Sequence, residues 1–371
     1  MLRTLREFLP ESTEHGGMVL PLVQTINYRP SVQLAVCLTL PGQAATIRAV
    51  FLSSDDNVLK SWKFWAGLVL LLGLVYLVEH SFGWVNVLAS WQSVPPQSLA
   101  LAVTAMLLSY LLRALRFYDF FYRYCQGRFT LLTRITVMHN FFNNLLPMRS
   151  GETAFPLLMK QHFALPYRHS APALLWLRLL DLYALLVLAM ISLKELLELP
   201  VAAEWSIAVA LLLAPLLVLP LQNAVEQYLQ RHPSRWSARL AELMHALPKS
   251  PWPFIRALFW TLINWALKLA VYAWLLQQFL PLPFYQSWVG ATTGELSSVL
   301  PINGVAGAGT YEAGVVAGLI PWQVDHGAAL AAAVNLHLFV LGSTFLLTAV
   351  IALITLRAAH SVPPDQSIAP H

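Results

Sequence analysis

The sequence consists largely of apolar stretches, several of them about as long as a helix that crosses a bilayer. A helix needs about 20 apolar residues to span the hydrocarbon core. Hydrophobic residues make up 57% of the 371 residues and charged residues 11%, a far more apolar balance than that of a soluble globular protein. The apolar runs are continuous and do not alternate residue by residue, which argues against a β-barrel. The sequence therefore predicts an all-α polytopic membrane protein.

Short clusters of Lys and Arg between these stretches predict their orientation, because basic residues near membrane helices favour the cytoplasm. Arg113, Arg116 and Arg123 are interpreted as part of the cytoplasmic cluster after the second span. About six full spans are expected, at residues 64–79, 99–115, 172–193, 206–221, 254–280 and 326–356. We expect a multi-pass protein of the inner or plasma membrane with its C-terminus in the cytoplasm. The net charge of +5 lies in these clusters, so no nucleic-acid partner is expected.

The chain ends differ in composition from its centre. Prolines interrupt the N-terminal region, which is expected to be a loosely ordered extension, and the Pro-rich C-terminal tail is expected to be disordered. The predicted organisation is an extension at 1–58, a membrane domain at 59–357 with halves at 59–198 and 204–357, an interfacial segment at 222–250 and a tail at 358–371.

Two apolar stretches are interrupted by groups that lipid does not tolerate, at Asn140–Glu152 and Leu300–Glu312. Charges and irregular backbone persist at membrane depth only where they are buried in protein or line a wet cavity. Basic residues flank the first break on both sides, which predicts a hairpin that enters and leaves at the cytoplasmic face. The second break predicts a hairpin from the outer face. Two re-entrant helical hairpins of opposite orientation are therefore expected.

The order of spans and hairpins predicts an inverted repeat. Each half reads span, span, hairpin, span, and the two halves begin on opposite sides of the membrane. Leu146-Pro147 and Leu300-Pro301 have the same spacing as Asp181 and Asn335. Many transporters use such a repeat to expose a central site alternately to either face.

An anion site is predicted where the two hairpin tips meet. The second helix of each hairpin would begin near mid-membrane, at about Ser150 and Thr310, where free N–H groups and the helix dipole favour an anion. Arg149 is the natural phosphate partner, since a guanidinium binds two oxygens at once. Gly307 and Gly309 permit close approach of the backbone.

Several polar residues have two interpretations each. Glu152 and Glu312 either brace cations or take up protons in proton-coupled transport, and Arg149 and Glu152 alternatively form an ion pair that caps the hairpin. Arg178 and Asp181, three residues apart on one helix, either pair with each other or contact the ligand.

Two further charged residues complete the candidate set. Lys268 either faces the site or extends its amino group towards the membrane surface, and Glu295 has no obvious partner. The expected substrate-binding residues are Asn144, Arg149, Ser150, Gly151, Glu152, Arg178, Asp181, Lys268, Glu295, Asn303, Gly307, Gly309, Thr310 and Glu312.

Motifs of covalent chemistry are missing from the sequence. It contains no GxSxG elbow, no HExxH, no metal-spaced histidine cluster and no nucleotide loop. Cys37 and Cys125 are too few for a zinc site or a disulfide framework. No catalytic residue, cofactor or metal is expected.

The sequence around the breaks resembles a known family. NNLLPMRSGE, the Arg178-Leu-Leu-Asp181 helix and LPINGVAGAGTYE are similar to the flippase-like transmembrane domain of lysylphosphatidylglycerol synthases and its stand-alone relatives. That family typically has LLP-x-R-x-GE at the first break and P-x-x-GG-x-G-x-x-E at the second. The residues that match are Pro147, Arg149, Gly151, Glu152, Gly307, Gly309 and Glu312, whereas the paired glycine is replaced by Val305-Ala306-Gly307. The resemblance covers about residues 60–357.

The resemblance implies a role in moving a lipid between leaflets, or in a related step of envelope lipid handling. Lysylation of lipid is not expected, because no soluble aminoacyl-transfer domain follows the last helix. Our leading hypothesis is a transporter, not an enzyme, for an anionic phospholipid or a polyprenyl-phosphate-linked lipid. The alternatives are a membrane-embedded enzyme with Glu152 or Glu312 as base, and a structural partner of a separate envelope glycosyltransferase or synthase. Homodimerisation is left open.

Overall fold

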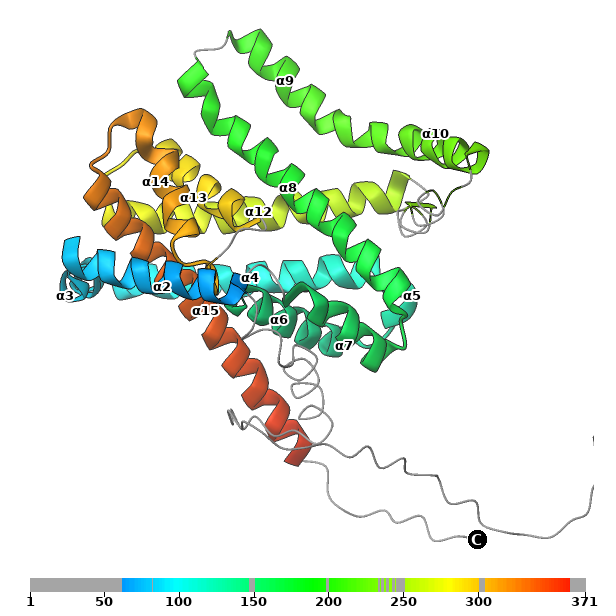
Figure 1. Ribbon diagram of the computed structural model, residues 1–371, viewed down its shortest axis with the longest axis horizontal. Helices are drawn as coiled ribbons and strands as arrows, with labels where there is room; N and C mark the ends of the chain where they lie inside the picture. The colour runs from blue at the N-terminus through cyan, green and yellow to red at the C-terminus, as the bar shows by residue number, and fades with distance from the viewer. Residues whose placement is uncertain are drawn as a thin grey trace, which may run out of the picture. The chain divides into compact units, whose positions relative to one another are not determined.

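The computed structural model is all-helical over the residues that it describes (Figure 1). These are 62–81, 83–146, 151–197, 200–232, 251–299 and 304–360, with single positions between 234 and 244. The expected N-terminal extension and nearly all of the expected tail lie outside them.

The helices are α2 (Trp62–Ser81), α3 (Trp84–Ala89), η1 (Ser90–Ser93), α4 (Pro96–Phe120), α5 (Tyr122–Cys125), α6 (Phe129–Leu145), α7 (Ala154–Phe163), α8 (Tyr167–Leu197), α9 (Val201–Leu213), η3 (Ala214–Leu217), α10 (Val218–Arg231), α12 (Pro251–Phe279), α13 (Phe284–Val299), η4 (Val305–Gly307), α14 (Thr310–Leu319), η5 (Ile320–Trp322) and α15 (His326–His360).

Four of the described helices are long and apolar enough to cross a membrane. They are α4, residues 167–190 of α8, residues 252–279 of α12 and residues 326–351 of α15. The first expected span lies in α2. Its segment Leu71–Ser81 is long and apolar enough to cross only together with Trp84–Ser93, which comprises α3 and η1, and the two are bent by 83°. The described chain therefore has four helices that could cross a membrane, or five if the bent pair is one span.

The expected span at 206–221 is wrong as a single helix. The α-helix α9 ends at Leu213, a 3₁₀ turn follows at Ala214–Leu217, and α10 continues from Val218. The turn contains Pro215, and a proline has no backbone N–H to donate to a helix. The run is apolar enough for a span, but it is divided into pieces shorter than the bilayer requires.

The same series of helices occurs twice along the chain. The first series is α4, α6, α7 and α8, with 25, 17, 10 and 31 residues, and the second is α12, α13, α14 and α15, with 29, 16, 10 and 35 residues. In both series the first helix packs on the second, the second on the third, and the third on the fourth. The observed order of elements thus agrees with the expected repeat.

The two series meet along α4 and α12, which run antiparallel. Near the C-terminal end of α4, Asp119 accepts a hydrogen bond of 3.0 Å from Arg256 near the start of α12. Further back along α4, Ser109 donates to Asn264 at 2.9 Å. Antiparallel contact between corresponding helices is the arrangement that an inverted repeat requires.

Glycines allow the hairpin of α13 and α14 to pack closely. Gly290 and Gly294 on α13 face Leu319 and Val315 of α14, and Gly318 on α14 lies against Gly290. Side chains are absent at these points, so the two helix backbones come near enough for extensive van der Waals contact.

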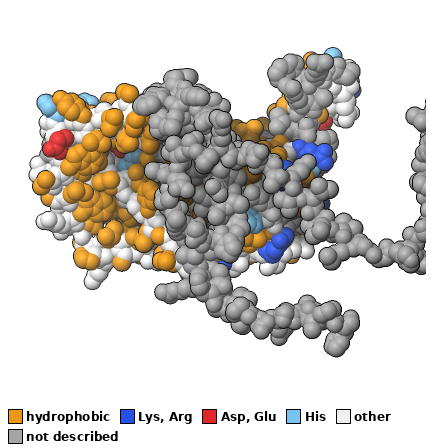
Figure 2. Space-filling view, turned by 60° about the horizontal axis from the view of Figure 1, so that its bottom comes forward, with side chains coloured by type: hydrophobic (Ala, Val, Ile, Leu, Met, Phe, Trp, Pro, Cys, Tyr) orange, Lys and Arg blue, Asp and Glu red, His pale blue; other side chains and the backbone are white. Residues whose placement is uncertain are grey.

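The described surface carries large apolar side chains that a soluble protein would bury. Examples are Leu101 on α4, Leu175 on α8 and Phe259 on α12, with 60%, 53% and 54% of their surface exposed. Figure 2 shows hydrophobic side chains over much of the described surface on its left, and Lys and Arg side chains on its right. Such a surface suits contact with lipid.

Candidate functional site

The two sequence breaks border one polar cavity of about 80 Å³. Asn144 and Leu146 line it from the end of α6, and Ala306 and Gly307 line it from η4, which contacts α6. Helices α4, α8, α12, α13, α14 and α15 complete the walls. One buried water needs about 10–15 Å³, so the cavity has room for several waters or for a small polar group. The expected meeting of the two breaks around a shared polar space is therefore observed.

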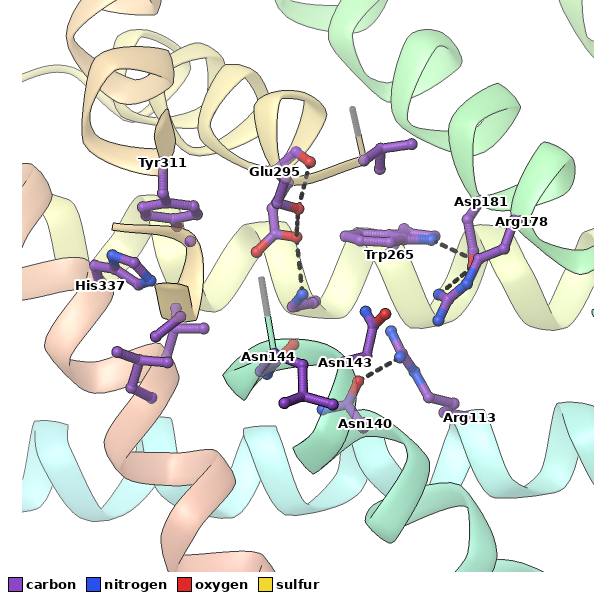
Figure 3. Close-up of a pocket in the computed structure, with 18 residues that line it drawn as sticks. Arg113, Asn140, Asn143, Asn144, Arg178, Asp181, Trp265, Glu295, Tyr311 and His337 are labelled. Carbon is purple, nitrogen blue, oxygen red and sulfur yellow. Dashed lines mark hydrogen bonds and ion pairs between the residues drawn. The ribbon is translucent and has the colours of Figure 1, made fainter. Parts of the chain in front are cut away.

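Charged side chains lie along the whole cavity (Figure 3). Arg113, Arg178 and Asp181 lie at one end, and His337 and Tyr311 lie at the other. Lys268 and Glu295 also line it. Charges this far from water are stable only in pairs or beside a polar ligand, which makes each partner informative.

Asp181 is the fixed counter-ion of the arginine end. It is 1% exposed and accepts hydrogen bonds from Arg116, from the indole of Trp265 at 2.8 Å and from Arg178 at 3.2 Å. The expected pairing of Arg178 with Asp181 is present, and Arg178 also lines the cavity. With four N–H donors from three residues on its two oxygens, Asp181 positions cations and has little capacity left for a ligand.

Glu152 forms an ion pair with Arg178, its Oε1 lying 3.0 Å from Nε. Arg178 also contacts His139 at 3.0 Å through Nη2. Of the residues expected at this tip, Arg149 and Ser150 lie outside the described residues. Gly151 is described and packs so closely on the backbone of Phe142 that a β-carbon would collide with it.

Arg113 is a cation of the cavity wall without a described carboxylate partner. Its Nη1 donates to Asn140 Oδ1 at 2.7 Å, and it forms no ion pair among the described residues. Asn140 is held in turn by the hydroxyl of Tyr110, on the same helix as Arg113. The remaining donors of this guanidinium are available to an anion in the cavity.

The interpretation of Arg113 and Arg116 as part of a cytoplasmic cluster is wrong. They are 7% and 1% exposed and point into the protein. The helix α4 continues to Phe120, beyond the expected end of the span at 115, so both arginines lie within it. A basic residue near the end of an apolar run can face either the membrane surface or a buried partner. Here Arg113 is directed inward by Asn140 and Arg116 by Asp181.

Lys268 and Glu295 pair with each other. Their Nζ and Oε2 atoms are 3.0 Å apart, and both side chains are largely buried. The ammonium group also lies over the rings of Trp265 and Tyr272. The interpretation of Lys268 as extending to the membrane surface is therefore wrong, and Glu295 has a partner that the sequence did not reveal.

The second break has the irregular backbone that its glycines predict. Gly307 and Gly309 have φ values of 79° and 83°, and Ala306 also lies in the left-handed region at 56°. The hydroxyl of Thr310 donates to the carbonyl of Gly307 at 3.0 Å and tightens the turn. Asn303 lies outside the described residues.

Glu312 occupies the N-terminus of α14, where an external anion was expected. Its Oε2 accepts a hydrogen bond from the N–H of Gly309 at 2.8 Å, and its Oε1 lies 2.7 Å from Nδ1 of His337. A carboxylate of the protein itself thus uses the favourable end of this helix dipole.

The two hairpins share an ion-pair arrangement. In each, a glutamate near the start of the short second helix pairs with a basic residue on the long helix that follows. The pairs are Glu152 with Arg178 and Glu312 with His337. This correspondence is a second sign of the repeat, and it differs from the residue matches that the sequence suggested.

A family comparison agrees with this architecture. The model of the lysylphosphatidylglycerol synthase TM region matches residues 64–360. The chain belongs to this family. No curated protein and no solved structure matches the chain. Membership of the lysylphosphatidylglycerol synthase TM family indicates a multi-pass membrane protein with a function related to membrane lipids.

In this family member the expected site residues that the structure describes, all except Arg149, Ser150 and Asn303, fall into three groups. Asn144, Arg178, Asp181, Lys268, Glu295 and Gly307 line the cavity. Glu152 and Glu312 hold residues that line it. Gly151, Gly309 and Thr310 shape the two breaks.

Sequence reasoning missed Arg113, Asn143, Tyr311 and His337, which also line the cavity. His337 was the one with a detectable signal, because a titratable residue inside the apolar stretch 326–351 is unusual. Asn143 Oδ1 and the Tyr311 hydroxyl are buried without a hydrogen-bond partner among the described residues. Both add hydrogen-bonding capacity for a polar ligand.

Proposed function

We propose that this member of the lysylphosphatidylglycerol synthase TM family translocates an anionic lipid between leaflets, either a phospholipid or a polyprenyl-phosphate-linked lipid. The observation that carries the proposal is Arg113, a buried cation on the cavity wall with no described carboxylate partner. A phosphate oxygen would pair with this guanidinium through charge-assisted hydrogen bonds. Arg178, already fixed by Asp181 and Glu152, supports the same end of the cavity.

The size of the cavity supports binding of the headgroup alone. A free space of about 80 Å³ accommodates a small polar group and excludes acyl or polyprenyl chains. In the proposed mechanism the chains stay in the surrounding lipid, against the apolar outer faces of α4, α8 and α12, while the headgroup crosses through the protein.

The proposed transport path depends on the two hairpins as re-entrant elements. None of the described helices α6, α7, α13 and α14 is long and apolar enough to cross the bilayer. Each pair would enter the bilayer and leave by the same face, α6–α7 from the cytoplasmic side and α13–α14 from the outer side. Movement of one half against the other would then open the cavity to each face in turn. In this proposed topology the protein lies in an inner or plasma membrane and its C-terminus is in the cytoplasm.

Reconstitution tests the proposal. The purified full chain is placed in phosphatidylcholine vesicles with a trace of fluorescent phosphatidylglycerol, and the label that becomes accessible to an external quencher is measured with time. The wild type should move the label, and Arg113→Ala should reduce the rate at least tenfold while Arg123→Ala, a change at an exposed arginine of α5, leaves it unchanged. Equal rates for both variants and the wild type would refute the role of Arg113.

A membrane-embedded enzyme is the second candidate, and one contact favours it. The Glu312 carboxylate holds Nδ1 of His337 at 2.7 Å, and the ring lines the cavity, which is the arrangement of a general base. Mass spectrometry of the lipid after the same incubation separates the two candidates. A transporter leaves the mass of the labelled lipid unchanged, whereas an enzyme alters it.

A further inference from the structure

The two corresponding ion pairs of the repeat differ in one chemical respect. The base that pairs with Glu152 is Arg178, which stays charged at all accessible pH values. The base that pairs with Glu312 is His337, and histidine is the side chain whose charge ordinarily changes between pH 5 and 8. One half of the protein therefore has a fixed positive charge where the other half has a switchable one.

The surroundings of His337 leave one ring nitrogen free to take a proton. Nδ1 faces Glu312 at 2.7 Å, so this nitrogen carries hydrogen in the neutral ring and donates it to the carboxylate. The ring packs against Tyr311 with 4.6 Å between the centroids. Nε2 forms no hydrogen bond with a described residue and lies toward Gly307, where the lack of a side chain leaves space beside it. A proton that enters from the cavity would bind at Nε2.

Among the described residues, the charges around the cavity balance while His337 is neutral. The described cations that line the cavity or pair with its lining are Arg113, Arg116, Arg178 and Lys268, and the described anions are Glu152, Asp181, Glu295 and Glu312. A phosphodiester headgroup would add one negative charge to this balanced set. A net buried charge is expensive in a low dielectric, and a proton on His337 would cancel it.

Groups from every wall contribute to the field at His337. Glu312 and Tyr311 face it from α14, and Glu295 shares the cavity from α13, Lys268 from α12 and Arg113 from α4. Arg178 and Asp181 share it from α8. The helix α6 contributes only the neutral amides of Asn140, Asn143 and Asn144. The described carboxylates and cations of these walls are equal in number, and an anion at Arg113 would add one negative charge to the cavity.

We propose that His337 is a proton-binding site and that one proton is taken up at its Nε2 with each monoanionic headgroup. This inference rests on the proposed transport of an anionic lipid and identifies how that transport would be coupled to a proton gradient. No covalent bond to the lipid forms or breaks. The proton enters from the side of lower pH, neutralises the loaded cavity and leaves Nε2 when the headgroup leaves. Transport is then electroneutral.

Two measurements test the coupling. In the first, dihexanoyl phosphatidylglycerol is titrated into the detergent-purified full chain in weak buffer with a pH indicator, at pH values from 5.5 to 8.5. The wild type should take up close to one proton per bound lipid at the alkaline end of this range. Its affinity for the lipid should fall by up to tenfold for each unit by which the pH rises toward 8.5, because lipid binding and proton uptake are reciprocally linked.

Variants at His337 separate this coupling from a structural role. His337→Gln should bind the lipid without proton uptake and with an affinity independent of pH. His337→Arg, which copies the fixed charge of Arg178 in the other half, should bind at least as tightly as the wild type at pH 8.5, again without proton uptake. The control is His80→Gln, a change at an exposed histidine of α2, which should behave as the wild type.

The second measurement is transport in vesicles of phosphatidylcholine with fluorescent phosphatidylglycerol and an internal pH dye. An imposed pH gradient should accelerate transport at least threefold in the wild type, with proton movement that His337→Gln abolishes. Lipid transport that does not depend on pH or a gradient would overturn the proton inference and leave the proposed function standing. Absence of both binding and transport of this lipid at every pH would overturn the two together, and a variant that keeps wild-type proton uptake would show that His337 is not the site.

Discussion

Asp181 holds two buried arginines in position, so its removal should be among the most damaging changes in the protein. Replacement by Ala leaves Arg116 without its described ion-pair partner, and it removes one of the two carboxylates that Arg178 contacts. The indole N–H of Trp265 also loses its acceptor. An uncompensated buried charge costs about 3–5 kcal/mol, and we expect Asp181→Ala to lower the free energy of unfolding by that amount.

The partner of Asp181 supplies the matched experiment. Arg116→Met alone should cost about 3–5 kcal/mol for the same reason, because it leaves a buried carboxylate with less compensation. The double variant Arg116→Met with Asp181→Leu replaces the pair by apolar side chains of similar size and should recover most of the loss, because removing both charges also removes their desolvation penalty.

The assay is reversible unfolding of the purified protein in detergent or bicelles, followed by fluorescence for the wild type, both single variants and the double variant. The coupling energy between the two sites follows from the four values. A loss below about 1 kcal/mol for Asp181→Ala, or additive losses in the double variant, would refute the reasoning, since either result means that the two charges are not held as a buried pair.

Three further predictions concern the breaks and the packing around them. Ala306→Gly should raise the stability by up to about 1 kcal/mol, measured as a higher melting temperature, because Ala306 has a φ of 56°, where only glycine is unstrained. An unchanged or lower melting temperature would contradict backbone strain at Ala306. Gly318→Ala should destabilise by about 1–3 kcal/mol, since a β-carbon there collides with α13, whereas Gly73→Ala, with open space around it, should not. Burial raises the pKa of the Cys125 thiol to about 11, which leaves only about one thousandth of it as thiolate at pH 8. In a Cys37→Ser background, maleimide should therefore label Cys125 only after unfolding, and rapid labelling of the folded protein would contradict its burial.

The sequence predicted the architecture of the site through chemistry that lipid does not tolerate. Prolines, glycines and charges inside apolar stretches located both breaks, and the cavity does lie between them. The pairing of Arg178 with Asp181 followed from helical spacing. These features were predictable because they depend on residues close in sequence or on the cost of polar groups in hydrocarbon.

What the sequence could not predict depends on contacts between distant segments. The direction of Arg113 is set by Asn140 on α6, and Lys268 is held by Glu295 on α13. Hydropathy averages a helix over its circumference, so it does not distinguish a basic residue at the membrane surface from one turned into a cavity. Hydropathy also does not reveal the 3₁₀ turn at Ala214–Leu217, because the residues there are apolar and the break is one of backbone geometry.

The central claim is that the phosphate of an anionic lipid binds in the cavity between the two breaks, beside Arg113. An experimental structure of the full chain in nanodiscs that contain saturating dioleoyl phosphatidylglycerol tests it most directly. We expect headgroup density inside the cavity, with phosphate oxygens at about 3 Å from the Arg113 guanidinium. Lipid headgroups confined to the outer surface at saturation, with Arg113 facing only solvent or a protein carboxylate, would contradict the claim.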